Sequence, residues 1–129
     1  MRKTKWLAAG VIGLLAWNKL CAQSEHRGHG DKTGAQAVQG EVLDMACYMA
    51  HEGQGAKHKK CADKCIQGGA PLGLLTKEGQ VYLLVEDHAS PKPYAQIKGW
   101  AAEQVRVEGK VYERGGVRAI VVQSSAKAK

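Results

Sequence analysis

The sequence of 129 residues contains no phenylalanine, and aromatic residues make up only 5% of it. A hydrophobic core must therefore be built mainly from Val, Leu, Ile and Ala. Proteins that bind single-stranded nucleic acid without sequence preference need exposed aromatic side chains interleaved with Lys and Arg. Because this composition offers few such side chains, we expect no nucleic-acid partner.

The sequence also lacks a hydrophobic run long enough to cross a membrane comfortably. The uncharged run from Trp6 to Trp17 contains twelve residues, whereas a membrane-spanning helix needs about 20. A basic head, MRKTK, precedes this run, and the small residue Ala22 follows it. This pattern is typical of a secretory signal peptide. We therefore expect residues 1–22 to be removed and the protein to be periplasmic or secreted in a bacterium, with membrane attachment only if the signal stays uncleaved.

Cysteine is scarce, and its number changes if the signal is removed. The precursor has four cysteines, but Cys21 lies within the expected signal, which leaves Cys47, Cys61 and Cys65. An odd number of cysteines in an exported protein indicates a free thiol, an intermolecular bond or a bound metal. Cleavage also removes four basic residues and lowers the formal net charge from +7 to +3, so the basic precursor is weak evidence for an anionic partner.

The remaining chain is long enough for one small domain. Residues 23–36 are polar and lack a hydrophobic period, so we expect a flexible leader there, and we expect a disordered tail at 125–129. The folded domain should then span residues 37–124. A domain of this size often needs a metal or a disulfide for stability, and the Cys/His-rich insertion at 47–69 offers the residues for either.

Five segments have the alternating or β-branched pattern of strands. Turn residues at Gly79 and at Gly115 and Gly116 predict two hairpins, and Gly109 predicts a bulge or a sharp bend within the fourth strand. The five segments are AVQGEVLDM, PLGLLT, QVYLLVED, EQVRVEGKVYE and VRAIVVQSS.

One amphipathic helix is expected between the third and fourth strands, after two prolines. The apolar residues that recur there three or four positions apart are Tyr94, Ile97, Trp100 and Ala101. Five strands with a helix between the third and the fourth have the element order of the OB-fold. The expected fold class is therefore mainly β, a small five-stranded OB-fold-like barrel with a second, short Cys/His helix between its first two strands.

A resemblance agrees with this interpretation. The segments GEVLDMACYM, GGAPLGLLTKEGQVYLLVED and VRVEGKVYERGGVRAIVVQS, with the Cys/His segment after the first, resemble a group of small exported bacterial OB-fold domains. The resemblance covers residues 38–124 and implies the fold. It implies little about function, because OB-folds bind nucleic acids, sugars, proteins and metals alike.

The segment CYMAHEGQGAKHKKCADKC predicts a metal site. On a short helix, His58, Cys61 and Cys65 would lie at i, i+3 and i+7 and share one face. Cys47, at the end of the first strand, could close over this face as a fourth ligand. Three thiolates and one imidazole form a Cys₃His tetrahedral site, which suits a soft transition metal such as Zn or Cu(I).

The metal and its fourth ligand stay open. If residues 45–49 continue the strand, Met45, Cys47 and Met49 share one face, and two thioethers there would favour Cu(I). His51 could replace His58 as the imidazole ligand. Haem is not expected, because the attachment motif C-x-x-C-H is missing.

A disulfide is the alternative use of the same cysteines, because exported proteins meet an oxidising environment. Cys47 could pair with Cys61 or Cys65 and leave one free thiol. The chain would then be a stapled adaptor that binds an exported protein or a small ligand, without a metal. Catalysis is not expected in either case, because the segment lacks both a third orienting residue beside a Cys–His pair and the C-x-x-C motif of disulfide exchangers. The sequence thus favours an exported, non-catalytic binding module for a soft transition metal.

Overall fold

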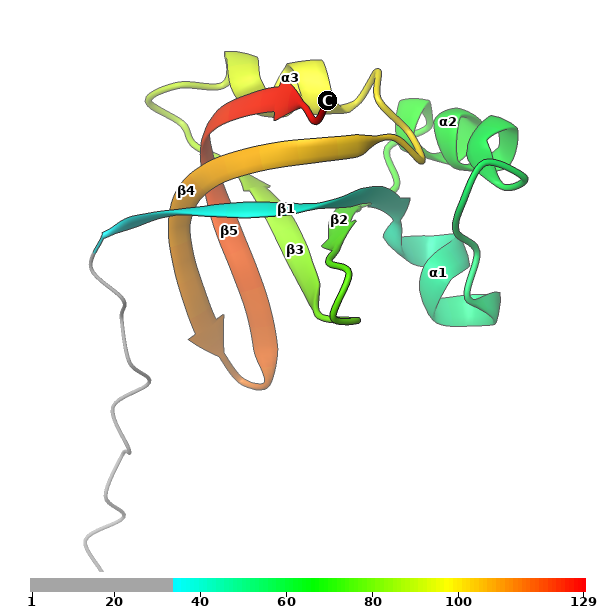
Figure 1. Ribbon diagram of the computed structural model, residues 1–129, viewed down its shortest axis with the longest axis horizontal. Coiled ribbons are helices and arrows are strands. Elements are labelled where there is room, and N and C mark those ends of the chain that lie inside the picture. Colours follow the sequence, from blue (N-terminus) through cyan, green and yellow to red (C-terminus); the bar gives the residue numbers. More distant parts are fainter. Residues whose placement is uncertain (1–33) are drawn as a thin grey trace, which may run out of the picture.

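The computed structural model describes residues 34–129, which form a closed barrel of five strands with two helices at one end (Figure 1). The strands follow one another around the barrel in the order β1-β2-β3-β5-β4. The elements are β1 (Ala35–Asp44), α1 (Met45–His51), α2 (Lys59–Gln67), β2 (Leu72–Leu75), β3 (Val81–Glu86), α3 (Lys92–Ile97), β4 (Gln104–Arg114) and β5 (Val117–Lys127).

Strand pairing closes the barrel as the predicted OB-fold requires. β1 is the strand shared by both halves, because it pairs antiparallel with β2 at one end and with β4 along most of its length. β2 and β3 form one antiparallel hairpin, and β4 and β5 form a longer one. The parallel pairing of β3 with β5 completes the closure. The mainly β, five-stranded barrel with a helix between β3 and β4 is therefore confirmed.

The strand pairing is irregular at Gly109, as predicted, but the extra residue lies in β5 and not in the fourth strand. Glu108 pairs with Ser124 and Gly109 with Val122, so Gln123 is the additional residue. The register between β4 and β5 shifts between Glu108 and Gly109. A Cβ added at Gly109 would overlap the backbone carbonyl oxygen of Val121 on the neighbouring strand. Only glycine allows the two backbones to approach so closely at this bend.

The barrel interior is aliphatic, as the absence of phenylalanine predicted. The buried side chains that fill it belong to every strand and to α2 and α3, while the aromatic residues Tyr82, Tyr94 and Trp100 are only partly buried around it. α3 ends at Ile97, and Trp100 and Ala101 lie beyond it, so the helix is shorter than the hydrophobic pattern predicted. The largest fully buried apolar side chains are Leu43, Leu72, Leu74, Ile97, Ile120, Val42, Val105, Val107 and Val122.

Two predicted boundaries are wrong. β1 begins at Ala35, two residues inside the predicted leader 23–36. The predicted tail 125–129 is strand as far as Lys127, which pairs with Val105 of β4. The polar residues at this end of β5 are held by backbone hydrogen bonds to β4, a tertiary effect that their composition does not reveal.

Residues 45–51 are helical, which contradicts the predicted extended segment and puts two helices rather than one between β1 and β2. Both lie beside the end of the barrel where β1 leaves it and β2 enters it (Figure 1). Within residues 34–129, no helix combines the length and the apolar character that a membrane span needs. The predicted signal peptide, Cys21 and most of the predicted leader lie outside the described residues.

Candidate metal centre

Asp44 ends β1 and starts α1. Its backbone is extended, and its carboxylate Oδ1 accepts a hydrogen bond of 2.9 Å from the backbone N–H of Ala46. This is the N-cap interaction that favours Asp directly before a helix. Because the helix begins at once, Cys47 lies in its first turn. The helix ends after His51, where Glu52 adopts a left-handed conformation with φ 56°.

The second helix presents two cysteines on one face. Cys61 and Cys65 are one turn apart on α2, while Ala62 and Ile66 face the barrel and are buried. Glu103 fixes the start of this helix to the barrel, because its carboxylate contacts Lys59 of α2 and Lys127 of β5, each at 2.6 Å. These two lysines lower the pKa of Glu103, Lys127 having the larger effect. The helix that contains Cys61 and Cys65 is therefore linked to the barrel at its first turn by these ion pairs.

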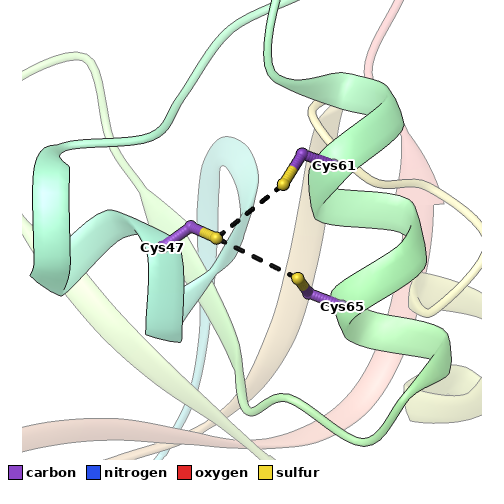
Figure 2. Close-up of side chains that lie close together, drawn as sticks. All are labelled: Cys47, Cys61 and Cys65. Carbon is purple, nitrogen blue, oxygen red and sulfur yellow. Dashed lines mark hydrogen bonds between the residues drawn. The ribbon is translucent and has the colours of Figure 1, made fainter.

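The three thiols converge between α1 and α2 (Figure 2). Cys47 Sγ lies 4.0 Å from Cys61 Sγ and 4.0 Å from Cys65 Sγ, and all three sulfur atoms lie within 4.8 Å of one another. The point equidistant from the sulfur atoms of such a triangle is about 2.2–2.5 Å from each, which includes the usual Zn–S length of about 2.3 Å. The triangle thus has the dimensions of a metal–thiolate site.

The predicted disulfide alternative is not formed in this structure. Cys47, Cys61 and Cys65 are all free, and Cys61 is the exposed member of the three. A disulfide requires two sulfur atoms about 2 Å apart, whereas Cys47 is equally distant from its two neighbours at 4.0 Å. Because Cys47 Sγ is equally distant from both other sulfur atoms, the arrangement favours one ion bound by all three cysteines over a disulfide between two of them and a third free thiol.

His58 lies beside this triangle and not within it. It precedes α2 as the N-cap residue, and a ring nitrogen lies within 4.8 Å of Cys47 Sγ and of a carboxylate oxygen of Asp44. The predicted set of Cys47, His58, Cys61 and Cys65 is therefore divided into two groups that share Cys47. Asp44 is a member that sequence reasoning missed. The signal that could have found it is an Asp at the end of a strand, three residues before a cysteine, where it can cap the following helix.

The remaining predicted ligands are less well placed. His51 is exposed, and its ring packs edge-on against that of His58 with centroids 5.5 Å apart. On a helix, Met45 and Met49 are each two residues from Cys47 and therefore point about 160° away from it around the axis. Met45 Sδ packs against Gly73, and Met49 is 74% exposed. The predicted shared face of Met45, Cys47 and Met49 is therefore wrong, and with it the argument that thioethers favour Cu(I).

The carboxylate of Asp44 affects the thiols next to it. Its acceptor oxygens and negative charge favour the protonated thiol and raise the pKa of Cys47 to about 12, and burial adds to this effect. Burial raises the pKa of Cys65, and Asp44 adds to it. Burial also raises the pKa of Asp44 itself, but the Cys47 thiol and the Ala46 amide outweigh it, so that the net pKa lies below its ordinary value. Without a cation in the site, these thiols therefore hold their protons at neutral pH.

The fold and the site together define an OB-fold-like barrel with a three-cysteine cluster, close enough to hold a metal ion, inserted between its first two strands. No protein-family model matches the chain, and no curated protein or solved structure matches it. The resemblance to small exported bacterial OB-fold domains therefore stays a prediction.

Proposed function

We propose that this protein is an exported, non-catalytic module that binds Zn(II) through Cys47, Cys61 and Cys65. The observation that supports the proposal best is the convergence of three free thiols from two helices at the spacing of a metal–thiolate site. Thiolates are the ligands that Zn(II) and Cu(I) prefer in proteins. Metal binding would release the thiol protons, so the affinity should fall as the pH falls.

Zinc has more support than copper. The thioethers of Met45 and Met49, which would favour Cu(I), do not face Cys47. The other potential ligands near the thiols are an imidazole and a carboxylate, from His58 and Asp44. Cys, His and Asp are all common zinc ligands.

A structural role for the ion follows from how α1 is held. None of the residues of α1 is buried, so this helix contributes little to the hydrophobic core. A metal bound to Cys47 on α1 and to Cys61 and Cys65 on α2 would link the two helices to each other. Because the unfolded chain does not bring these cysteines together, the free energy of metal binding would add to the free energy of folding.

The Cys61→Ser variant tests the proposal. Cys61 is exposed, so the substitution should leave the barrel folded while it removes one of three thiolates. We expect the affinity for Zn(II) to fall at least 100-fold, because changes outside the ligands themselves already cost about 10–100-fold in known sites. Competition with a chromophoric chelator under reducing conditions measures this affinity.

The control is Asp63→Ser, which changes an exposed residue of the same helix between the two cysteines. Its affinity for Zn(II) should equal that of the wild type. If Cys61→Ser also binds Zn(II) as the wild type does, the thiols do not hold the metal, and the stapled adaptor that binds a protein or a small ligand becomes the better interpretation.

Export is the second part of the proposal, and it rests on the basic head and the short uncharged run of residues 1–22. The mature protein should begin at Gln23. An intact-mass measurement of protein from the native host that still includes Met1 would contradict export by cleavage.

A further inference from the structure

Two buried side-chain atoms remain without a hydrogen-bond partner in residues 34–129, and both lie at the same place. They are Asp44 Oδ2 and His58 Nε2. A buried polar atom without a partner costs about 1–3 kcal/mol, so such atoms are rare in folded proteins and need a reason. Carboxylate oxygens and imidazole nitrogens are also the atoms with which Asp and His bind metal ions.

Cys47 is the third potential ligand beside Asp44 and His58. A carboxylate oxygen of Asp44, a ring nitrogen of His58 and Cys47 Sγ all lie within 4.8 Å of one another. Asp44 itself is fully buried. Its Oδ1 is already engaged with the Ala46 amide as the cap of α1, which fixes the carboxylate and leaves Oδ2 for another partner.

The loop after α1 leaves room for the imidazole of His58. Gly53 is buried, and a Cβ added to it would lie 2.7 Å from His58 Nε2 and 2.8 Å from Cε1. A side chain at this position would therefore push the ring out of its place. The ring of the exposed His51 also packs edge-on against the imidazole, with centroids 5.5 Å apart. The local sequence thus keeps His58 beside Asp44 and Cys47.

Charge gives an independent reason for a second cation. Metal binding to three thiolates places three negative charges beside the buried carboxylate of Asp44, which forms no ion pair with any Lys or Arg among the described residues. One Zn(II) would leave this group with two uncompensated negative charges. Two Zn(II) ions would balance it, and the ion next to Asp44 would compensate its buried negative charge, which is unfavourable without a partner.

We propose that the site holds two Zn(II) ions that share the Cys47 thiolate. One ion is bound by Cys47, Cys61 and Cys65, and the second by Cys47, His58 and Asp44. The second position rests on the proposed function, because it uses a thiolate of the first. It gives each ion three protein ligands, and the second ion takes two of its ligands from the residues that contain the unpartnered buried atoms.

The number of zinc ions per chain tests this proposal. The reduced, full-length mature chain is loaded with Zn(II), freed of excess metal, and measured by native mass spectrometry. We expect two zinc ions in the wild type and one in both Asp44→Asn and His58→Ala. Asn retains the oxygen that caps α1, and His58→Ala changes a half-buried residue outside the barrel core, so at least one variant should fold. Gly53→Ala should also weaken binding of the second ion, because it displaces the His58 ring.

The matched control is His88→Ala, which removes an exposed histidine of the loop after β3 and should leave two zinc ions. One zinc ion in the wild type would overturn the shared site and leave the proposed function intact. Two zinc ions in both Asp44→Asn and His58→Ala would also overturn it, because neither side chain would then be a ligand. A wild type without zinc would refute the proposed function and the shared site together.

Discussion

Substituting Cys47 by Ser should lower the melting temperature of the zinc-loaded protein by about 15–30 °C. Cys47 belongs to both ligand groups, so its loss removes metal binding as a whole. A ligand present at about 1,000 times its dissociation constant stabilises the folded state by about 4 kcal/mol. For a domain of this size, each kcal/mol changes the melting temperature by about 4–8 °C. Thermal unfolding in a zinc buffer, followed by circular dichroism, measures the difference.

The same experiment with a chelator provides the control. Without metal, the wild type and Cys47→Ser should melt within a few degrees of each other, because Cys47 is only half-buried and contributes little to the core. An equal loss of stability with and without zinc would mean that Cys47 acts through packing, and the metal would then have no part in holding α1.

The second large effect is expected in the barrel and not in the metal centre. Ile120 of β5 is fully buried, and Ile120→Ala should cost about 2–5 kcal/mol of the free energy of unfolding. Val117 is 53% exposed at the start of the same strand, so Val117→Ala should cost no more than about 0.5 kcal/mol. Urea unfolding of both variants measures these costs. Similar values for the two would contradict the observed placement of the core.

Ile120→Ala also separates the barrel from the site. Ile120 lines neither ligand group, so the folded variant should bind Zn(II) with the affinity of the wild type. A loss of affinity for Zn(II) in Ile120→Ala would contradict this separation, because it would show that the arrangement of α1 and α2 depends on the packing of the barrel core.

The barrel could be predicted from the sequence because its signals are local. Alternating apolar residues and Gly-containing turns define each strand and hairpin, and Gly109 identifies where the pairing is irregular, although not that the extra residue lies in β5. The end of β5 could not be predicted, because Ala126 and Lys127 have no apolar pattern and belong to the strand only through their pairing with β4. The same holds for Ala35 and Gln36 at the start of β1, which pair with β4.

The part of the site that depends on local sequence spacing was predicted, and the part that depends on tertiary structure was not. The helical spacing of Cys61 and Cys65 placed both on one face, and Cys47 was expected to close over it. The helix α1 was missed because a β-branched strand pattern leads directly into it, although Asp44 is a capping residue. The role of Asp44 beside the thiols depends on its burial at the end of the barrel, and burial at that point is a property of the tertiary structure.

X-ray absorption at the zinc edge of the wild-type protein, loaded with Zn(II) under reducing conditions, tests the central claim most directly. A centre built on Cys47, Cys61 and Cys65 predicts zinc that survives dialysis, with sulfur ligands at about 2.3 Å. Zinc with only nitrogen and oxygen ligands at about 2.0–2.2 Å would contradict a thiolate site. So would a protein that retains no zinc while all three thiols are reduced.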